Sequence, residues 1–218
     1  MPERVVEYKP RLRNRVYVKL SGGRFFTIPE SESLRLRAGT VLSDPEIEKI
    51  TRIDQYFRGK DKALRLISIR PRTHYEIRTA LDGLDIAPAI RQGILGELKE
   101  TGLVDDVRFA REYVRTKVDV RRLGPHRLRH ELKRLGVAPP IVEDAIEAEF
   151  TGERQEVLAR DIVRRKLGAG KPNEKEVRRL HGLLVRRGID YEIANRLIYE
   201  LLTRSIPEPD GDTEEYEA

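Results

Sequence analysis

The chain contains neither cysteine nor tryptophan, and only 6% of its residues are aromatic. The absence of cysteine excludes disulfide scaffolds, thiol catalysis and metal sites with cysteine ligands. No stretch approaches the ~20 consecutive apolar residues that span a bilayer, and residues 1–7 lack the apolar core of a signal peptide. We therefore expect a cytoplasmic protein with no membrane partner.

Apolar side chains are scarce as well. Hydrophobic residues make up 39% of the 218 residues and charged residues 37%, against about 45–50% and about 25% in typical globular domains. Such a chain cannot fill one thick core, but it suits helices with narrow apolar stripes and wide solvated faces. The composition therefore predicts an elongated array of small helical units.

The charge of the chain is unevenly distributed. The net charge is +6, yet six acids and no base follow Ser205, so the rest of the chain carries +12. A basic body predicts a polyanionic or acidic partner, and arginine, which outnumbers lysine 32 to 11, suits bidentate contacts with phosphate. The alternative is a merely solvated basic surface. We expect the acidic tail, residues 206–218, to be disordered.

Residues 16–28 are the one segment with a strand pattern. Val16, Val18 and Leu20 alternate with polar residues before a Ser-Gly-Gly turn and a short apolar return. We predict a two-stranded β-hairpin here, which must pack on another element because an isolated hairpin is marginally stable. A long helix should follow, with Asp44 as its cap and a break near Gly59.

Beyond residue 61 the apolar pattern is helical and repeats. Six positions recur in three stretches at offsets of 51 and 52 residues: Ile77, Leu81, Ile86, Ile90, Ile94 and Leu98; Leu128, Leu132, Val137, Ile141, Ala145 and Glu149; Leu180, Leu184, Ile189, Ile193, Leu197 and Leu201. Gly136 and Gly188 occupy equivalent places and should each stop a helix. With an earlier helical pattern before each stretch, every unit is three helices of about 50 residues, and neighbouring units should stack.

We therefore predict an all-α fold, an elongated array of tandem three-helix repeats with a small N-terminal β-hairpin plus helix extension. The expected domains are the extension, 1–60; the three repeats, 61–104, 105–152 and 153–205; and the tail, 206–218.

Catalytic and metal-binding patterns are weak throughout. Gly170 and Lys171 resemble part of a phosphate loop, but Pro172 replaces the Ser or Thr that such a loop requires. His126 and His130 have a metal-like spacing, yet flanking arginines repel cations, which favours surface histidines. We expect no enzyme activity, no cofactor and no metal site. The aromatic pair Phe109 and Tyr113 should belong to the core rather than to a stacking surface.

Two basic clusters, residues 115–134 and 160–187, are the best candidates for a binding surface. In the first, basic side chains lie off the apolar stripe of Leu128 and Leu132. In the second, Arg179 lies 52 residues after Arg127, so the repeat places arginines at equivalent points. The predicted filament or nucleic-acid contacts are Arg72, Arg121, Arg122, Arg127, Arg129, Lys133, Arg134, Arg164, Arg165, Lys171, Arg178 and Arg179. The alternative is that these charges only aid solubility.

Three segments resemble the bacterial RecX family. They are KALRLISIRPRTHYEIR at 62–78, LKETGLVDDVRFAREYV at 98–114, which is the most diagnostic, and LGPHRLRHELKRLGV at 123–137. The resemblance is close over 61–150 and extends over 153–205. It departs from the family pattern at His74 and in the acidic tail.

This resemblance implies a monomeric, non-enzymatic modulator of RecA. Such proteins bind the RecA filament on single-stranded DNA in its helical groove and lower filament growth, strand exchange, ATP hydrolysis and co-protease activity. Weak binding to single- and double-stranded DNA is also implied. The alternatives are a sequence-specific DNA-binding regulator built from helix-turn-helix-like units and an enzyme with a dispersed site.

Overall fold

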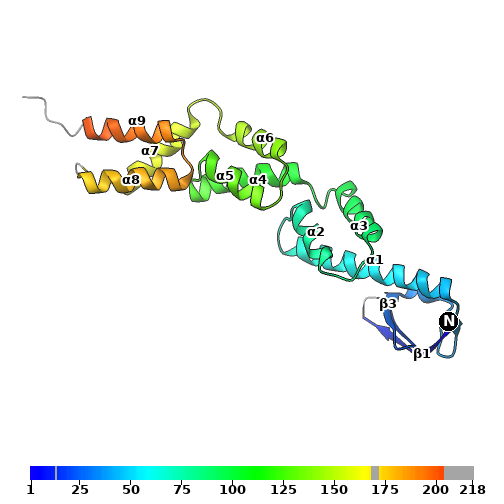
Figure 1. Cartoon of the computed structure of the whole chain (residues 1–218). Coiled ribbons are helices and arrows are strands. Elements are labelled where there is room, and N and C mark those ends of the chain that lie inside the picture. Colours follow the sequence, from blue (N-terminus) through cyan, green and yellow to red (C-terminus); the bar gives the residue numbers. More distant parts are fainter. Residues whose placement is uncertain (13, 168–171, 204–218) are drawn as a thin grey trace, which may run out of the picture. The chain divides into compact units, whose positions relative to one another are not determined.

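The structure is a computed structural model that describes residues 1–12, 14–167 and 172–203. The chain forms two compact units, which meet in sequence at Asp105 and Asp106 (Figure 1). The first unit contains the elements β1 (Glu3–Arg11), β2 (Arg15–Leu20), β3 (Phe25–Pro29), a 3₁₀ helix (Glu30–Ser33), β4 (Val41–Leu42), α1 (Asp44–Ile69), α2 (His74–Asp82) and α3 (Pro88–Glu100).

The N-terminal sheet is larger than the predicted hairpin. Strands β2 and β3 pair as expected, but β1 and β4 extend the antiparallel sheet to the order β3-β2-β1-β4. The prediction of a single β element was wrong for two reasons. A bulge between Val5 and Glu7 interrupts the alternation of β1, and β4 is only two residues long, too short to show a period.

One face of this sheet packs on the N-terminal half of α1. Val16, Val18 and Leu20 are buried against a cluster that includes Ile47 and Ile50 of the helix. The hairpin thus has the packing partner that its marginal stability requires.

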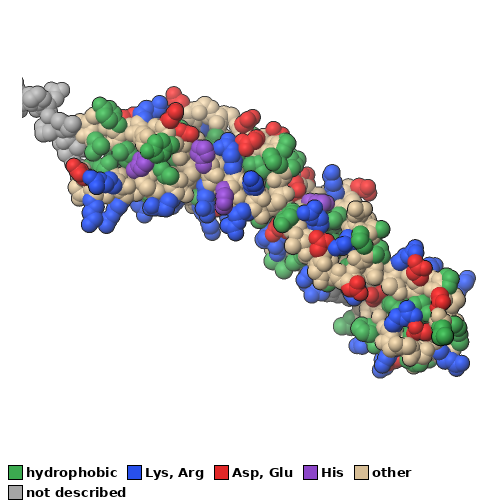
Figure 2. Space-filling model, in the orientation of Figure 1, with side chains coloured by type: hydrophobic (Ala, Val, Ile, Leu, Met, Phe, Trp, Pro, Cys, Tyr) green, Lys and Arg blue, Asp and Glu red, His purple; other side chains and the backbone are tan. Residues whose placement is uncertain are grey.

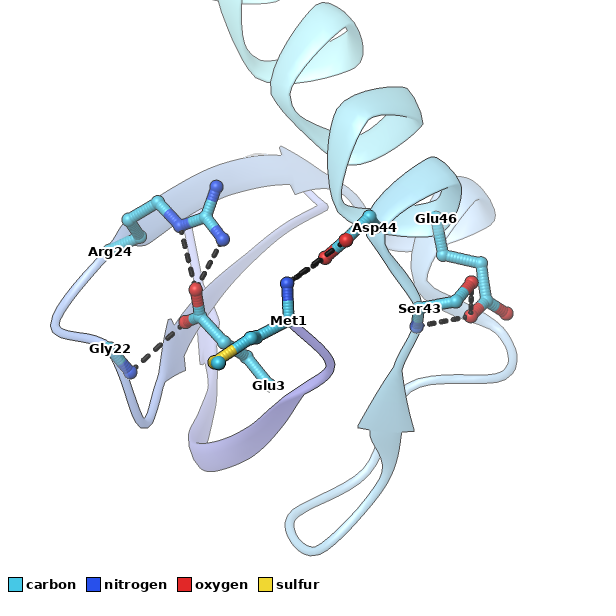
Figure 3. Close-up of polar contacts among 7 residues, drawn as sticks. All are labelled: Met1, Glu3, Gly22, Arg24, Ser43, Asp44 and Glu46. Carbon is cyan, nitrogen blue, oxygen red and sulfur yellow. Dashed lines mark hydrogen bonds and ion pairs between the residues drawn. The ribbon is translucent and has the colours of Figure 1, made fainter.

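Polar contacts tie the chain start to the sheet and to α1 (Figure 3). The Met1 ammonium donates to Asp44 at 2.7 Å, and the Glu3 carboxylate accepts from the Gly22 N–H at 3.0 Å and from Arg24. The helix cap is Ser43, one residue before the predicted Asp44, and its N–H donates to Glu46 at 2.8 Å in a capping box.

Helix α1 runs through Gly59 without the predicted break. Gly59 is buried, and a β-carbon there would lie 2.7 Å from the side chain of Ile94 and 2.9 Å from that of Ile86. This glycine therefore permits close packing of α1 with the α3 region rather than a turn. The predicted domain boundary after residue 60 falls inside this helix.

The second unit is entirely helical among its described residues. Its helices are α4 (Asp106–Arg121), α5 (Pro125–Arg134), α6 (Pro139–Glu149), α7 (Arg154–Lys166), α8 (Glu174–Arg187) and α9 (Tyr191–Thr203). Leu128, Leu132 and Leu184 are fully buried in one core, and Gly136 and Gly188 have φ angles of 74° and 81°. The helical-repeat fold with a small N-terminal β element is confirmed, whereas the exact repeat boundaries stay predictions.

The aromatic pair of α4 also belongs to this core, as predicted. Phe109 is buried, and Tyr113 packs against the cluster with its ring centroid 5.7 Å from that of Phe109. The acidic tail lies outside the described residues. In the part of the chain that the structure describes, no helix combines the length and apolarity needed to cross a membrane.

The end of α8 lies directly against the start of α5. The Gly124 N–H donates to the Arg187 carbonyl at 2.7 Å, and the His126 N–H donates to the Gly188 carbonyl at 3.1 Å. A β-carbon on Gly188 would lie 2.2 Å from the backbone nitrogen of Arg127. The first N–H groups of α5 and the last carbonyls of α8, which have no partner within their own helices, therefore satisfy each other. We call this contact the glycine junction.

Candidate functional site

The strongest candidate is a basic surface along α8 and α5. One hollow of 620 Å³ lies beside the glycine junction, and its polar lining residues are Arg121, His126, Arg127, His130, Glu131, Arg186 and Arg187. A second hollow of 620 Å³ on α8 is lined by Glu174, Lys175, Arg178, Arg179 and Arg186. The two hollows share Arg186, and together we call them the α5–α8 groove. Figure 2 shows Lys and Arg side chains gathered along this side of the unit.

Amphipathic helices place these cations at the surface. On α5, Leu128 and Leu132 are buried, so Arg127 points away from the core, with 47% of its side chain exposed. On α8, Leu180 and Leu184 are buried and Arg179 is exposed. The glycine junction then brings the two basic faces into one groove.

Glu131 is the acid within the first hollow, and each of its carboxylate oxygens accepts a hydrogen bond. It accepts from the Arg127 Nε at 2.9 Å and from the Tyr113 hydroxyl at 2.8 Å. Burial raises the pKa of Glu131, but these two hydrogen bonds, together with the positive charges of Arg127 and Lys117, outweigh that effect and hold the pKa below its ordinary value. Burial and the bond to Glu131 raise the pKa of Tyr113 to about 12. Glu131 is thus an ionised anchor for Arg127.

Neither of the two groove histidines lies in a group that could hold a metal ion, because no cluster of three His, Cys, Asp or Glu side chains occurs in the described residues. His126 Nε2 lies 3.4 Å from Asp190 Oδ2. A backbone hydrogen bond from Glu192, then that contact with His126, hold the pKa of Asp190 below its ordinary value.

Three predicted contacts lie outside the groove and share one carboxylate. Arg122, Arg164 and Arg165 each form a hydrogen-bonded ion pair with Asp161, at 2.7, 3.0 and 2.9 Å. The bond from Arg122, followed by those from the other two arginines, holds the pKa of Asp161 far below its usual range. Because Arg122 directly follows the last residue of α4 and Asp161 lies on α7, this cluster joins the end of α4 to α7.

Other predicted residues are engaged elsewhere. Arg129 pairs with Glu143 of α6 at 2.9 Å. In the first unit, Arg72 donates to Glu76 at 3.1 Å and to the Leu66 carbonyl at 3.3 Å, which closes the corner between α1 and α2. Lys171 lies outside the described residues. Lys133 and Arg134 are exposed at the far end of α5, but they do not line either hollow.

Sequence reasoning missed Lys175, Arg186 and Arg187, which line the groove. The repeat itself carried a signal for one of them, since Arg186 lies 52 residues after the predicted contact Arg134. Arg187 also donates from its guanidinium to the Arg121 carbonyl across the junction. Nothing in the local pattern indicated that contact between residues 66 positions apart.

Comparison with known proteins identifies the family. Residues 105–146 match the family described as RecX, second three-helix domain. The chain is 37% identical over 151 residues to Regulatory protein RecX of Thermobifida fusca, which covers 68% of this chain and 81% of the relative. The chain belongs to the RecX family. This RecX-family chain is also 29% identical to Regulatory protein RecX of Limosilactobacillus reuteri, over 93% of this chain and 76% of the relative.

Solved RecX structures agree with the fold. A crystal structure of regulatory protein RecX matches with a TM-score of 0.64 and 25% identity over 91% of this chain and 99% of that one. RecX from Lactobacillus salivarius matches with a TM-score of 0.57 and 26% identity, over 69% of this chain and 98% of that one. The first match extends well beyond the segment that the family description covers.

Proposed function

We propose that this RecX-family protein is a non-enzymatic regulator that binds the RecA filament on single-stranded DNA in its groove. Binding limits filament growth and so lowers strand exchange, ATP hydrolysis and co-protease activity. The relatives' name, Regulatory protein RecX, supports the regulatory role. The single observation that supports the mode of contact is the α5–α8 groove, whose cations can meet phosphate or an acidic protein surface.

The charges in the groove differ in how available they are. Arg127 and Arg178 each pair with a glutamate on their own helix, at 2.9 and 3.2 Å. Among the described residues, neither Arg179 nor Arg186 forms an ion pair. An unpaired exposed cation can neutralise a phosphate without first losing a partner, and it releases a counterion when it does so. Arg179 and Arg186 are therefore the contacts whose loss should weaken binding most directly.

The test is ATP hydrolysis by the cognate RecA on single-stranded DNA, titrated with the full chain. The wild type should depress hydrolysis at substoichiometric amounts. The double variant R179E/R186E should need about tenfold more protein for the same inhibition, because a tenfold change corresponds to only ~1.4 kcal/mol of lost contact. The matched control is R35E/R111E, which makes the same charge change at exposed positions outside the groove and outside both basic clusters.

Both variants should retain the wild-type circular-dichroism spectrum, since all four side chains are exposed. Undiminished hydrolysis across the whole titration of the wild type would refute the regulatory proposal. Equal inhibition by wild type, R179E/R186E and R35E/R111E would instead remove the groove from the mechanism.

A further inference from the structure

We propose that the outer face of the N-terminal sheet binds unpaired bases of single-stranded DNA by aromatic stacking. This site lies in the first unit and is separate in sequence from the α5–α8 groove. The inference depends on the proposed function only for the choice of single-stranded DNA as the ligand.

The alternation of the strands separates two faces of the sheet. On β2, Val16, Val18 and Leu20 are buried beneath the sheet, so Tyr17 and Lys19 lie on the other face. On β3, Phe26 and Ile28 are buried by the same rule. Phe25 consequently belongs to the outer face, where it is 64% exposed.

An aromatic stack crosses this outer face diagonally. Lys19 is the register partner of Phe25, and Thr27 is that of Tyr17, so the two rings are diagonal neighbours. Their centroids are 6.0 Å apart with planes inclined by 25°, and the Arg11 guanidinium lies 5.4 Å from the Tyr17 centroid on the β1 side. The stack thus ends at Phe25, whose exposed ring can accept a further planar group.

The turn that carries Phe25 is held in place. The Glu3 carboxylate accepts from the Gly22 N–H and from Arg24, which immediately precedes Phe25 (Figure 3). The hydrogen bond from Arg24 holds the pKa of Glu3 below its ordinary value, so the carboxylate stays ionised at neutral pH. A stacking ring on a fixed turn is ordered before the ligand arrives, which reduces the entropy cost of binding.

A hollow of 330 Å³ adjoins Phe25, at the small end of the ~300–1,000 Å³ range of ligand pockets. Phe25 and Thr27 of β3 form one wall, and the other lining residues are Asp54, Arg58, Asp61, Lys62, Arg65 and Leu84. A hollow with an aromatic wall suits a single planar base better than a protein side chain of variable shape.

Each acid of this hollow already forms an ion pair with an arginine. Asp54 accepts from the Thr27 N–H at 2.7 Å and pairs with Arg58 at 3.6 Å. Asp61 pairs with Arg15 at 2.9 Å. An excess of positive charge therefore remains around the stack and the hollow. It comes from other cations, which form no ion pair within the described part of the chain: Arg11, Lys19, Lys62 and Arg65.

This charge excess decides which occupant fits. An exposed aromatic ring among unpaired cations is the arrangement by which proteins bind single strands, with bases stacked on rings and phosphates on cations. A duplex keeps its bases stacked on one another and cannot supply them to Phe25. An acidic peptide would use the cations but would gain little from the ring, so the contribution of the bases distinguishes the two ligands.

The experiment uses the full chain and two oligonucleotides of equal length and charge, one of thymidines and one of abasic sites. F25A should weaken binding of the thymidine oligomer about 5- to 150-fold, which corresponds to ~1–3 kcal/mol for one stacked base, and should leave binding of the abasic oligomer unchanged. The matched control is V41A on β4 of the same sheet, at another exposed apolar residue; it should alter neither affinity.

A second variant provides a direct optical signal. Because the chain has no tryptophan, F25W introduces a single one into the stack. Its fluorescence should be quenched by the thymidine oligomer and not by the abasic one, with thymidine affinity retained.

Equal losses on both oligomers for F25A, or no quenching of F25W by thymidines, would overturn the proposal. The two proposals can fail separately. If R179E/R186E loses RecA inhibition and F25A weakens binding of the thymidine oligomer alone, both sites are supported. A wild type that fails to inhibit RecA but binds thymidines through Phe25 would refute only the RecA proposal.

Discussion

Substitution of Gly188 by alanine should disrupt the glycine junction and destabilise the second unit. Two costs combine in this variant. The residue has a φ of +81°, and an L-residue in that left-handed region costs about 1–2 kcal/mol. The new β-carbon would also lie 2.2 Å from the Arg127 backbone nitrogen, so α5 must move away from α8.

Movement of α5 breaks the two backbone hydrogen bonds of the junction, from Gly124 to Arg187 and from His126 to Gly188. A hydrogen bond contributes about 0.5–1.5 kcal/mol net, so the total expected loss is about 2–5 kcal/mol. The measurement is the free energy of unfolding from urea denaturation of the full chain. Hydrogen exchange of the Gly124 and His126 amides should accelerate in the same variant.

Two controls separate backbone strain from close approach. Gly152 has a φ of +55° with no heavy atom within 4 Å of a built β-carbon, so G152A should lose only the backbone cost of about 1–2 kcal/mol. Gly124 lacks a positive φ, but its β-carbon would lie 2.4 Å from the Gly188 carbonyl oxygen, so G124A tests close approach alone. If G188A is no less stable than G152A, and G124A resembles the wild type, the junction carries no packing constraint and the reasoning fails.

Two further predictions concern the core and its titration. L132A and L184A should each lower the free energy of unfolding by about 2–5 kcal/mol, because both leucines are fully buried at equivalent repeat positions. The control V120A, at a residue 70% exposed, should change it by about 0.5 kcal/mol or less. Similar values for all three variants in urea denaturation would contradict the repeat register. Tyr113→Phe should remove the hydrogen bond that lowers the pKa of Glu131. A lowered folded-state pKa stabilises the protein at pH values above the ordinary glutamate pKa, and this stabilisation is lost as the pH falls. The variant should therefore be less stable than the wild type at neutral pH, and the difference in their free energies of unfolding should shrink in acid. A difference that does not change with pH would disprove the coupling.

Much of the fold could be predicted from the sequence because it depends on local patterns. The spacing of Leu128, Leu132, Leu180 and Leu184 is a property of helix geometry, and these residues are buried as expected. Gly188 stops its helix because a positive φ favours a residue without a β-carbon. The strand β1 was missed because its bulge removes the alternation on which sequence analysis depends.

The candidate site was predictable only in part, because a cation can be held in an ion pair by a carboxylate on a helix distant in sequence. The sequence placed arginines at Arg127 and Arg179 through the 52-residue repeat, and both line the groove. It could not show that Arg122 and Arg165 would share Asp161, since a helix contact across 39 residues leaves no trace in local periodicity.

The sequence alone determined the helical repeat, the net basic charge and the family to which the chain belongs. The tertiary structure decided which charges act together, because the end of α8 lies against the start of α5 and brings Arg186 into a groove with Arg127. It likewise placed Phe25 beside Tyr17, since strand register and not sequence separation fixes which side chains share a face of a sheet. Local periodicity sets which side chains point outward, while long-range backbone contacts set which of them meet.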